Sequence, residues 1–378
     1  MDDRDRRDIT NENGVGCILE VDFEYSKELH DAHNEYPLAP ESIKVDRVHK
    51  LVPNLNDKKN YVVHHENLKM YDSMGLKITK IHRGIRFNES PWLKTYIDLN
   101  TKLRTKATNE FEKDFFKLMN NSVFGKTMEN IENHVDIRLV CDEKEAVKLA
   151  VRTNYDRFTI FDQNLIAVHM RRTKLKYNKP IYLGMCILDL SKTLMYDMHY
   201  NYIKNKYGDK AKLLFTDTDS LAYEIETEDF YKDIAHDIKA RFDTSEYPTD
   251  HPSGIETGVN KKELGKFKDE AAGKQIDEFI GLRPKSYSYK MFGGDEHKKC
   301  KGIKRNVVKT KITHNDYKNC LVGNTEEYRR MNVIRSYKHD MYTEEVNKIA
   351  LSANDDKRVI MADGIHTLAI GHHKTNAL

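Results

Sequence analysis

The chain has 378 residues, 39% of them hydrophobic, which is enough to bury a sizeable core in about two or three domains. No apolar run approaches the ~18 residues that span a bilayer, and the charged N-terminus lacks the apolar stretch of a secretory signal, so we expect no membrane association and no secretion. Five scattered cysteines without a C-x-x-C pair indicate a reducing compartment and argue against structural zinc.

The formal net charge of +3 is a small difference between 63 basic and 60 acidic residues, so the distribution of charge matters more than its sum. Residues 298–311 hold seven Lys or Arg and no acid, and residues 171–179 hold five in nine positions. Clusters of this kind are typical of phosphate binding, with a solvated charged face as the alternative.

Short strands are predicted in the first 90 residues, at "GCILEVDF" and "YVVHH", followed by helical spacing over residues 92–135. Asn109 with Glu112 resembles a capping box at a helix start. The apolar stripe that we expect to face the core of the protein consists of Phe111, Phe115, Leu118, Met119 and Ser122. The opposite side of this helix carries Lys113, Lys117, Asn121 and Phe124.

A second long helix is predicted over residues 188–208, ending at Gly208. "AKLLF" and "LAYEIE" then read as strands, with "TDTD" at or beside the tip of a β-hairpin. Further strands are predicted in "LGKFKDE", "DEFIGLRPKSYSYKMF" and "KCKGIKR", with a turn at residues 293–295 between the last two. Beyond residue 313 the pattern is mostly helical.

Asp217 and Asp219 lie two residues apart, so in an extended strand both carboxylates would point to the same face. Close carboxylates repel each other unless a cation lies beside them, and Mg²⁺ prefers a few carboxylates together with phosphate oxygens. A polar hairpin turn is the plain alternative. The D-x-D of nucleotide-sugar glycosyltransferases, which also holds a divalent metal, is another.

Two further stretches carry suitable chemistry. In "KLMNNSVFGK", residues 117–126, a lysine precedes an asparagine by one turn and an aromatic residue and glycine follow, which suits phosphates, a sugar and a base. In "LRPKSYSY", Lys285 and Tyr287 are expected on one face of a strand, able to touch a nucleic-acid backbone, or else to protect a sheet edge. The basic run that follows could grip a duplex through Lys301, Lys304 and Arg305.

"KLMNNSVFGK", "FTDTDS" and "LRPKSYSY" resemble, in order and rough spacing, motif B, motif C and the K-x-Y motif of family B DNA polymerases. The resemblance is closest to the protein-primed branch of bacteriophages, linear plasmids and Polinton/Maverick-type transposable elements. It implies an α+β fold, in which a palm of antiparallel sheet with helices carries helical fingers and thumb. It also implies a role in DNA replication, with primer-template DNA and dNTPs as partners and Mg²⁺ as the cofactor in a two-metal site.

The resemblance implies a role for each matching residue. Asp219 would bind the catalytic Mg²⁺ ions directly and Asp217 would support it. Lys117, with Lys113 on the same helix face, would bind nucleotide phosphates, while Asn121 and Phe124 would shape the pocket for sugar and base. Lys285 and Tyr287 would hold primer terminus and template. The family usually carries tyrosine at the position of Phe124, so this chain would keep the stacking face and lose a hydroxyl.

Motif A, roughly D-x-x-x-L-Y, supplies a further metal-binding carboxylate in this family, and we expect it to lie before residue 1. The resemblance does not extend to the exonuclease domain of the family. Asp22 in "CILEVDFEYSKELHD" is the nearest replacement ligand, with a surface strand end as its alternative. The sequence therefore predicts the C-terminal part of a polymerase. Two hypotheses stay open, namely a DNA-directed DNA polymerase and a catalytically inert nucleic-acid-binding remnant.

The implied domains are a palm segment with an insertion over residues 1–95, fingers over 96–135, palm over 136–290 and thumb over 291–378. Protein-primed relatives carry a terminal-protein contact near the first of these, which makes a terminal protein a possible partner. Nucleus and cytoplasm fit the implied chemistry equally. The histidine pairs His30/His33 and His64/His65 lack further ligands nearby in sequence, so we expect them to lie on the surface.

Overall fold

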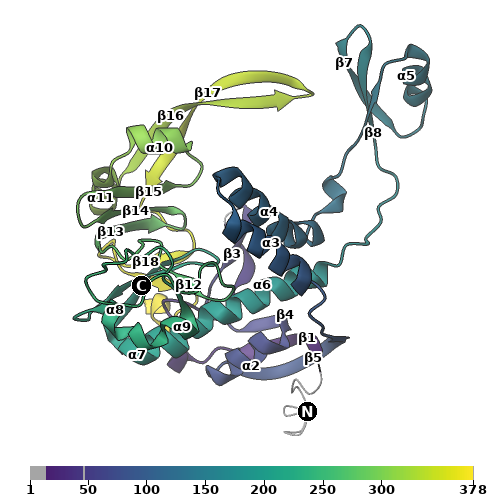
Figure 1. The fold of residues 1–378 in the computed structure, drawn as a ribbon. Helices are drawn as coiled ribbons and strands as arrows, with labels where there is room; N and C mark the ends of the chain where they lie inside the picture. The colour runs from purple at the N-terminus through teal and green to yellow at the C-terminus, as the bar shows by residue number, and fades with distance from the viewer. Residues whose placement is uncertain (1–13, 46, 378) are drawn as a thin grey trace.

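The computed structural model describes residues 14–45 and 47–377. Helices and strands are mixed throughout the chain, which confirms the predicted α+β class. Figure 1 shows a long helix in the middle of the molecule, a β-hairpin (residues 326–352) that extends from the C-terminal part, and a small separate unit (residues 136–170) on two long connections. Within the described residues, no helix is both long and apolar enough to cross a membrane.

The first unit is an antiparallel sheet in the order β4-β1-β5, which confirms the two strands predicted there. Its core gathers Val21, Phe23, Leu68 and Tyr71 from β1 and the helix α2. The elements are β1 (Val15–Glu24), η1 (Lys27–Leu29), the hairpin β2 (Glu41–Val45) and β3 (Val48–Val52), β4 (Lys58–His64), α2 (His65–Ser73) and β5 (Lys77–Asn88).

Two antiparallel helices follow, α3 (Lys94–Lys106) and α4 (Glu110–Thr127). The Asn109 side chain accepts a hydrogen bond from the Glu112 N–H (2.9 Å), so the predicted N-cap is confirmed. The expected core stripe is wrong at Phe111, Phe115 and Leu118, which are 78%, 45% and 63% exposed, while Met119 is half-buried. Outside the pair, α4 packs against α6, and this contact leaves Phe111 and Leu118 exposed.

Residues 136–170 form a small body of their own within the span 136–290 (Figure 1). Its sheet has the order β6-β8-β7, and Val140, Leu149, Val168 and Met170 make a separate core. The elements after α4 are η2 (Ile131–Asn133), β6 (Asp136–Val140), α5 (Glu143–Ala150), β7 (Tyr155–Asp162) and β8 (Leu165–Met170).

The long central helix consists of α6 (Ile181–Tyr196), the π-helical η3 (Asp197–Lys204) and α7 (Asn205–Tyr207). It ends at Gly208, as predicted, where φ is +54°, but it begins seven residues before the predicted start at 188. It packs against α2, β4 and α4, and Tyr196 is buried between the first sheet and the proline-rich loop before β2, where its hydroxyl donates to the Pro37 carbonyl (3.0 Å). This helix therefore joins α4 to the first sheet.

After the turn η4 (Gly208–Lys210), the chain enters the hairpin that carries the aspartates and then a three-stranded antiparallel sheet, β13-β14-β15. The predicted turn at residues 293–295 between β14 and β15 is confirmed. "KCKGIKR" is strand only as far as Cys300, because the chain turns and enters a helix at Arg305. The elements are β9 (Ala211–Thr216), β10 (Leu221–Ile225), α8 (Phe230–Asp233), η5 (Ala235–Asp237), α9 (Ile238–Arg241), β11 (Phe242–Asp243), β12 (Phe267–Lys268), β13 (Ile276–Arg283), β14 (Ser286–Met291), β15 (Glu296–Cys300), α10 (Arg305–Lys311) and α11 (His314–Gly323).

The prediction of mostly helix beyond residue 313 is wrong past α11. A long hairpin of β16 (Glu326–Tyr337) and β17 (Asp340–Ser352) follows, because alternate side chains such as Met331 and Val333 pack on the core beneath α10 and α11. The remaining elements are β18 (Arg358–Ile360), β19 (Thr367–Ala369) and η6 (His373–Ala377). Ala369 of β19 enters the core of the first sheet, so the C-terminal end of the described chain packs against this first unit.

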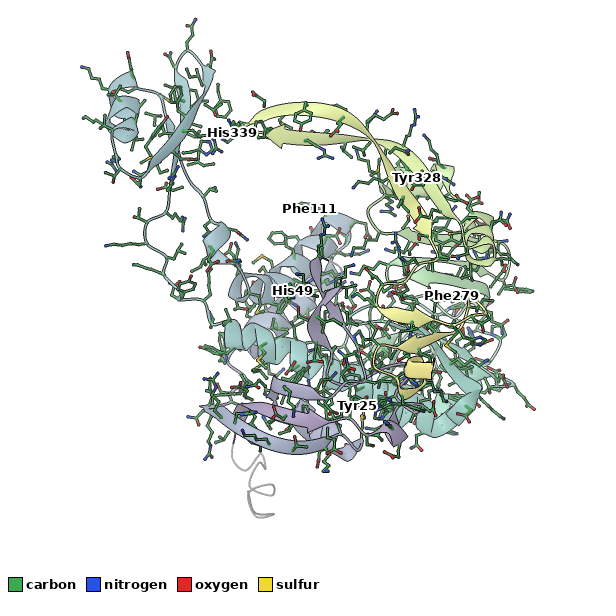
Figure 2. All side chains as sticks on the ribbon, turned by 180° about the vertical axis from the view of Figure 1, so that it is seen from behind. Tyr25, His49, Phe111, Phe279, Tyr328 and His339 are labelled. Atoms are coloured by element: carbon green, nitrogen blue, oxygen red, sulfur yellow. The ribbon has the colours of Figure 1, made fainter. Side chains whose placement is uncertain are left out.

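The tip of the β16–β17 hairpin meets the 136–170 unit. His339 Nε2 lies 2.6 Å from His169 Nε2, and its ring packs edge-on against Phe161. Figure 2 shows His339 at this meeting point, so that hairpin and unit together form an arch over α3 and α4. This contact joins residues about 170 positions apart in the sequence.

Candidate active site

Asp217 and Asp219 lie at the tip of the β9–β10 hairpin, as predicted, in a tight turn over residues 217–220 that we call the DTD turn. The Asp217 N–H donates to the Ser220 carbonyl (3.0 Å) and the Ser220 N–H donates back (3.2 Å). Thr218 has φ +58°, so the segment is not extended, and the expected same-face geometry of a strand is wrong. The turn instead presents a partly buried Asp217 and an exposed Asp219 side by side in the chain.

A second turn lies against the first. Pro284 and Lys285 form the two-residue connection between β13 and β14, which we call the lysine turn. Lys285 has φ +63° and lies outside the strand, so the expectation that Lys285 and Tyr287 share one strand face is wrong. The turn carries Lys285 Nζ to 3.2 Å from Asp217 Oδ1. Because these side chains are 55% and 35% exposed, the ion pair contributes little to stability, about 0–1 kcal/mol.

Aromatic rings hold the two turns together. Phe215, just before the DTD turn, stacks on Tyr287, just after the lysine turn, with ring centroids 4.4 Å apart, and on Phe279 at 5.8 Å. Burial raises the pKa of Tyr287, and the nearby carboxylates of Asp217 and Glu270 raise it further. Sequence reasoning missed Phe215, Phe279 and Glu270. The alternation of Ala211, Leu213 and Phe215 in β9 marks Phe215 as inward-facing, whereas Phe279 alternates with the buried Ile280 and Leu282 of β13 and carries no such signal.

The basic run begins at the lysine turn, because the Lys301 N–H donates to the Lys285 carbonyl (3.0 Å). Lys304 precedes α10 as its N-cap residue and Arg305 is the first residue of that helix. All three side chains from this run are exposed. The structure therefore forms a continuous positively charged edge from Lys285 to α10.

The α4 residues lie elsewhere. Lys113 forms an ion pair with Glu110 (2.6 Å), Lys117 and Asn121 are exposed, and Phe124 is partly buried. Within the described part of the chain, no hydrogen bond, ion pair or ring contact joins these four residues to the DTD turn or the lysine turn. The structure thus joins the DTD turn, Lys285 and Tyr287 by direct contacts, and these contacts do not extend to the α4 residues.

Asp22 is neither a surface strand end nor a neighbour of the DTD turn. Its side chain is 10% exposed within β1, where Oδ1 accepts hydrogen bonds from the Asn60 N–H (2.8 Å) and the His82 ring (2.9 Å) and Oδ2 lies 3.6 Å from Lys59 Nζ. The Asn60 N–H and the His82 ring lower the pKa of Asp22 to about 2. Both oxygens are therefore occupied within the first sheet.

The four histidines expected on the surface are buried, so that expectation is wrong. His30 meets His372 and His373 from the C-terminal end, with one nitrogen of each ring within 4.8 Å of the others. The His373 N–H donates to His30 Nδ1 (2.9 Å), which leaves the proton of a neutral His30 ring on Nε2. As arranged, that nitrogen is a donor and no metal ligand, and the cluster packs the C-terminal end of the chain against the loop after η1.

Comparisons with known proteins bear on the fold. A family model described as "DNA polymerase type B, organellar and viral" matches residues 15–205. A phi29 DNA polymerase structure in an orthorhombic crystal form matches with TM-score 0.55 at 14% identity, covering 90% of this chain and 52% of that one. A phi29 ternary complex with primer-template DNA and incoming nucleotides matches with TM-score 0.52 at 16% identity, covering 89% and 51%. The chain spans about half the length of these polymerases. The search of curated proteins found no match.

Proposed function

This chain belongs to the organellar and viral type B DNA polymerases, and we propose on that premise that the DTD turn and the lysine turn form its nucleotidyl-transfer site. The reaction is template-directed attack of a primer 3′-hydroxyl on the α-phosphate of a dNTP, with release of pyrophosphate. The observation that carries the proposal is the ion pair between Lys285 Nζ and Asp217 Oδ1 at 3.2 Å. It joins two motifs that lie 68 positions apart in the sequence.

The donor set of the DTD turn fits Mg²⁺. Asp217 and Asp219 offer hard carboxylate oxygens on an accessible turn, and Lys285 already places a cation against one of them. When bound, Mg²⁺ lowers the pKa of the primer hydroxyl and stabilises the charge on the leaving pyrophosphate. Asp219, the more exposed of the pair, is the direct ligand in this proposal, and Asp217 supports it while orienting Lys285.

The remaining residues take roles that follow from position and charge. Lys285 and Tyr287 hold the primer terminus and template beside the DTD turn, and the edge of Lys301, Lys304 and Arg305 continues the path for duplex phosphates. The phi29 structures in complex with primer-template DNA support this placement as an analogy of fold.

We further propose that α3 and α4 act as fingers that bind the incoming dNTP through residues of α4. Lys117, with Lys113 one turn before it, binds the triphosphate, and Asn121 with Phe124 forms the pocket for sugar and base. These residues do not touch the DTD turn, so this role requires the helices to approach it when a nucleotide binds. The assignment of residues 1–95 and 136–290 to palm and 291–378 to thumb, and a terminal-protein primer as partner, belong to the same proposal.

Primer extension by the purified chain tests this function, with a short primed template, Mg²⁺ and four dNTPs, beside the variants Asp219→Asn and Asp209→Asn. Asp209 is an exposed aspartate before β9, so its variant is a control of matched charge. We expect Asp219→Asn to abolish any Mg²⁺-dependent extension that the wild type and Asp209→Asn show, with DNA binding unchanged. Equal extension by all three would overturn the ligand role of Asp219.

A second candidate function is DNA binding without catalysis, and the surroundings of Asp22 favour it. Both oxygens of this carboxylate are held by Asn60, His82 and Lys59, so it is not available to complete a metal site. Binding of primer-template DNA in a gel shift without extension by any variant would support this second function.

A further inference from the structure

A positively charged cavity of about 470 Å³ lies between α3 and the loop that contains Lys262. Four lysines line it, namely Lys94, Lys102, Lys106 and Lys262. Lys94 is paired with Asp98 at 2.6 Å, but in the described part of the chain neither Lys102 nor Lys106 has an ion-pair partner. The lining also includes Glu263, which lies 3.9 Å from Lys266, so four lysines face two acids and the cavity carries net positive charge.

The loop side of the cavity is rigidly built. The Lys262 N–H donates to the buried Asp243 carboxylate (2.9 Å), and Lys262 Nζ donates to the Arg104 carbonyl (3.1 Å). Burial lowers the pKa of Lys262, and the neighbouring cations Arg104, Lys261 and Lys113 lower it further. Gathering so many cations costs free energy unless an anion compensates for it. The arrangement is one that a phosphate group would stabilise.

Exposed aromatic rings lie at the end of the helix pair where α3 is connected to α4. Phe111 and Phe115 on the first turns of α4 are 78% and 45% exposed, and their rings stack with centroids 6.3 Å apart. Figure 2 shows Phe111 at the free end of α4. Phe111 follows Lys106, which lines the cavity, by only five residues across the short connection between α3 and α4, so the rings lie near that end of the cavity.

We propose that the lysine cavity and the Phe111–Phe115 face together bind single-stranded DNA, an inference that rests on the proposed function and deepens it. Single strands offer both phosphates and unpaired bases, and sequence-independent binding combines basic grooves with aromatic stacking platforms. A duplex would leave the two rings without a base. From Lys94 to Lys106 the cavity wall runs about 18 Å along α3, which is several nucleotides of backbone and more than one triphosphate.

The charge is tested by the salt dependence of binding of a fluorescent oligothymidylate to the full chain, measured by anisotropy without Mg²⁺. Each lost phosphate contact on a single strand reduces the slope of log K against log salt by about 0.7. Lys102→Gln/Lys106→Gln should therefore reduce the slope by about 1.4, and both side chains are exposed, so folding is preserved. Lys69→Gln/Lys80→Gln, on α2 and β5, is the matched control and should leave the slope unchanged.

The rings are tested with Phe111→Ala/Phe115→Ala, for which we expect about tenfold weaker binding per lost base stack. Phe292→Ala, at an equally exposed phenylalanine in the β14–β15 turn, is the control. An unchanged slope and affinity in both double variants would overturn the inference. Equal losses for a blunt duplex, or competition by inorganic tripolyphosphate as effective as by unlabelled single strand, would overturn it in favour of a general anion site. Primer extension, which depends on Asp219, is measured in a separate experiment. A failure of the proposed polymerase function can therefore be distinguished from a failure of the proposed single-strand binding.

Discussion

Phe215 is the residue that joins the DTD turn to the lysine turn, and the strength of that connection can be measured. Its ring stacks on Tyr287 at 4.4 Å and on Phe279 at 5.8 Å. Each aromatic pair contributes about 0.5–1.5 kcal/mol beyond the area that it buries. Phe215→Leu keeps most of the apolar area and loses both pairs, so it should lower the local opening free energy of the two hairpins by about 1–3 kcal/mol.

A double-mutant cycle isolates the contact between the turns. We expect Phe215→Leu and Tyr287→Leu to be coupled by about 0.5–1.5 kcal/mol, measured by native-state hydrogen exchange of the peptides that contain β9, β10, β13 and β14. Tyr328→Leu, on the distant β16, serves as the partner in a control cycle and should combine additively with Phe215→Leu. Additivity of Phe215→Leu and Tyr287→Leu within about 0.3 kcal/mol would refute the idea that stacking fixes the position of the turns.

Three further outcomes follow from individual contacts. Burial, Arg157 and His339 lower the pKa of His169, so the contact between His169 and His339 should be present near pH 8 and be lost as the pH falls below about 6.5. The loss would be measured as a larger distance between probes on the β16–β17 hairpin and on the 136–170 unit. A distance that does not change with pH would contradict this. The pKa of Asp22 is lowered to about 2, so its stabilisation of the first sheet should be full above about pH 4 and disappear towards pH 2, and Asp22→Asn should abolish that dependence in exchange of β1 amides. Lys285→Ala should change the free energy of unfolding by less than about 1 kcal/mol and yet weaken the binding of primer-template DNA. Equal binding by the variant and the wild type would contradict the assignment of Lys285 to the site.

The parts of the fold that sequence predicts are those with local signals. The strands around the DTD turn, the cap at Asn109 and the helix end at Gly208 each follow from residues within a few positions of one another. The burial of His30 could not be predicted, because its neighbours His372 and His373 lie 342 and 343 positions away. The long β16–β17 hairpin could not be predicted, because its two strands contain many charged residues and few apolar ones. The alternation of apolar and polar residues that marks a strand is therefore not visible in the sequence.

The exposed Phe111 shows a different limit of sequence reasoning. Helical spacing of apolar residues predicts that they share a face, and Phe111 and Phe115 do share one. The spacing does not show whether another element of the fold covers that face. In this chain none of the described residues does so at the free end of α4, and the pattern that suggested core instead marks a surface available for binding.

The candidate site depends on two residues whose backbone is in a conformation that side chains disfavour. Thr218 in the DTD turn and Lys285 in the lysine turn both have positive φ, +58° and +63°, without being glycine. Such a conformation costs roughly 1–3 kcal/mol at each residue and persists only where surrounding contacts hold it. Here the strands β9, β10, β13 and β14 and the stacked rings of Phe215 and Tyr287 supply those contacts. Glycine would adopt either turn with less strain but would leave it free to move. A threonine and a lysine at these positions keep the two turns tight, and that tightness is what holds a cation from one chain segment against a carboxylate from another.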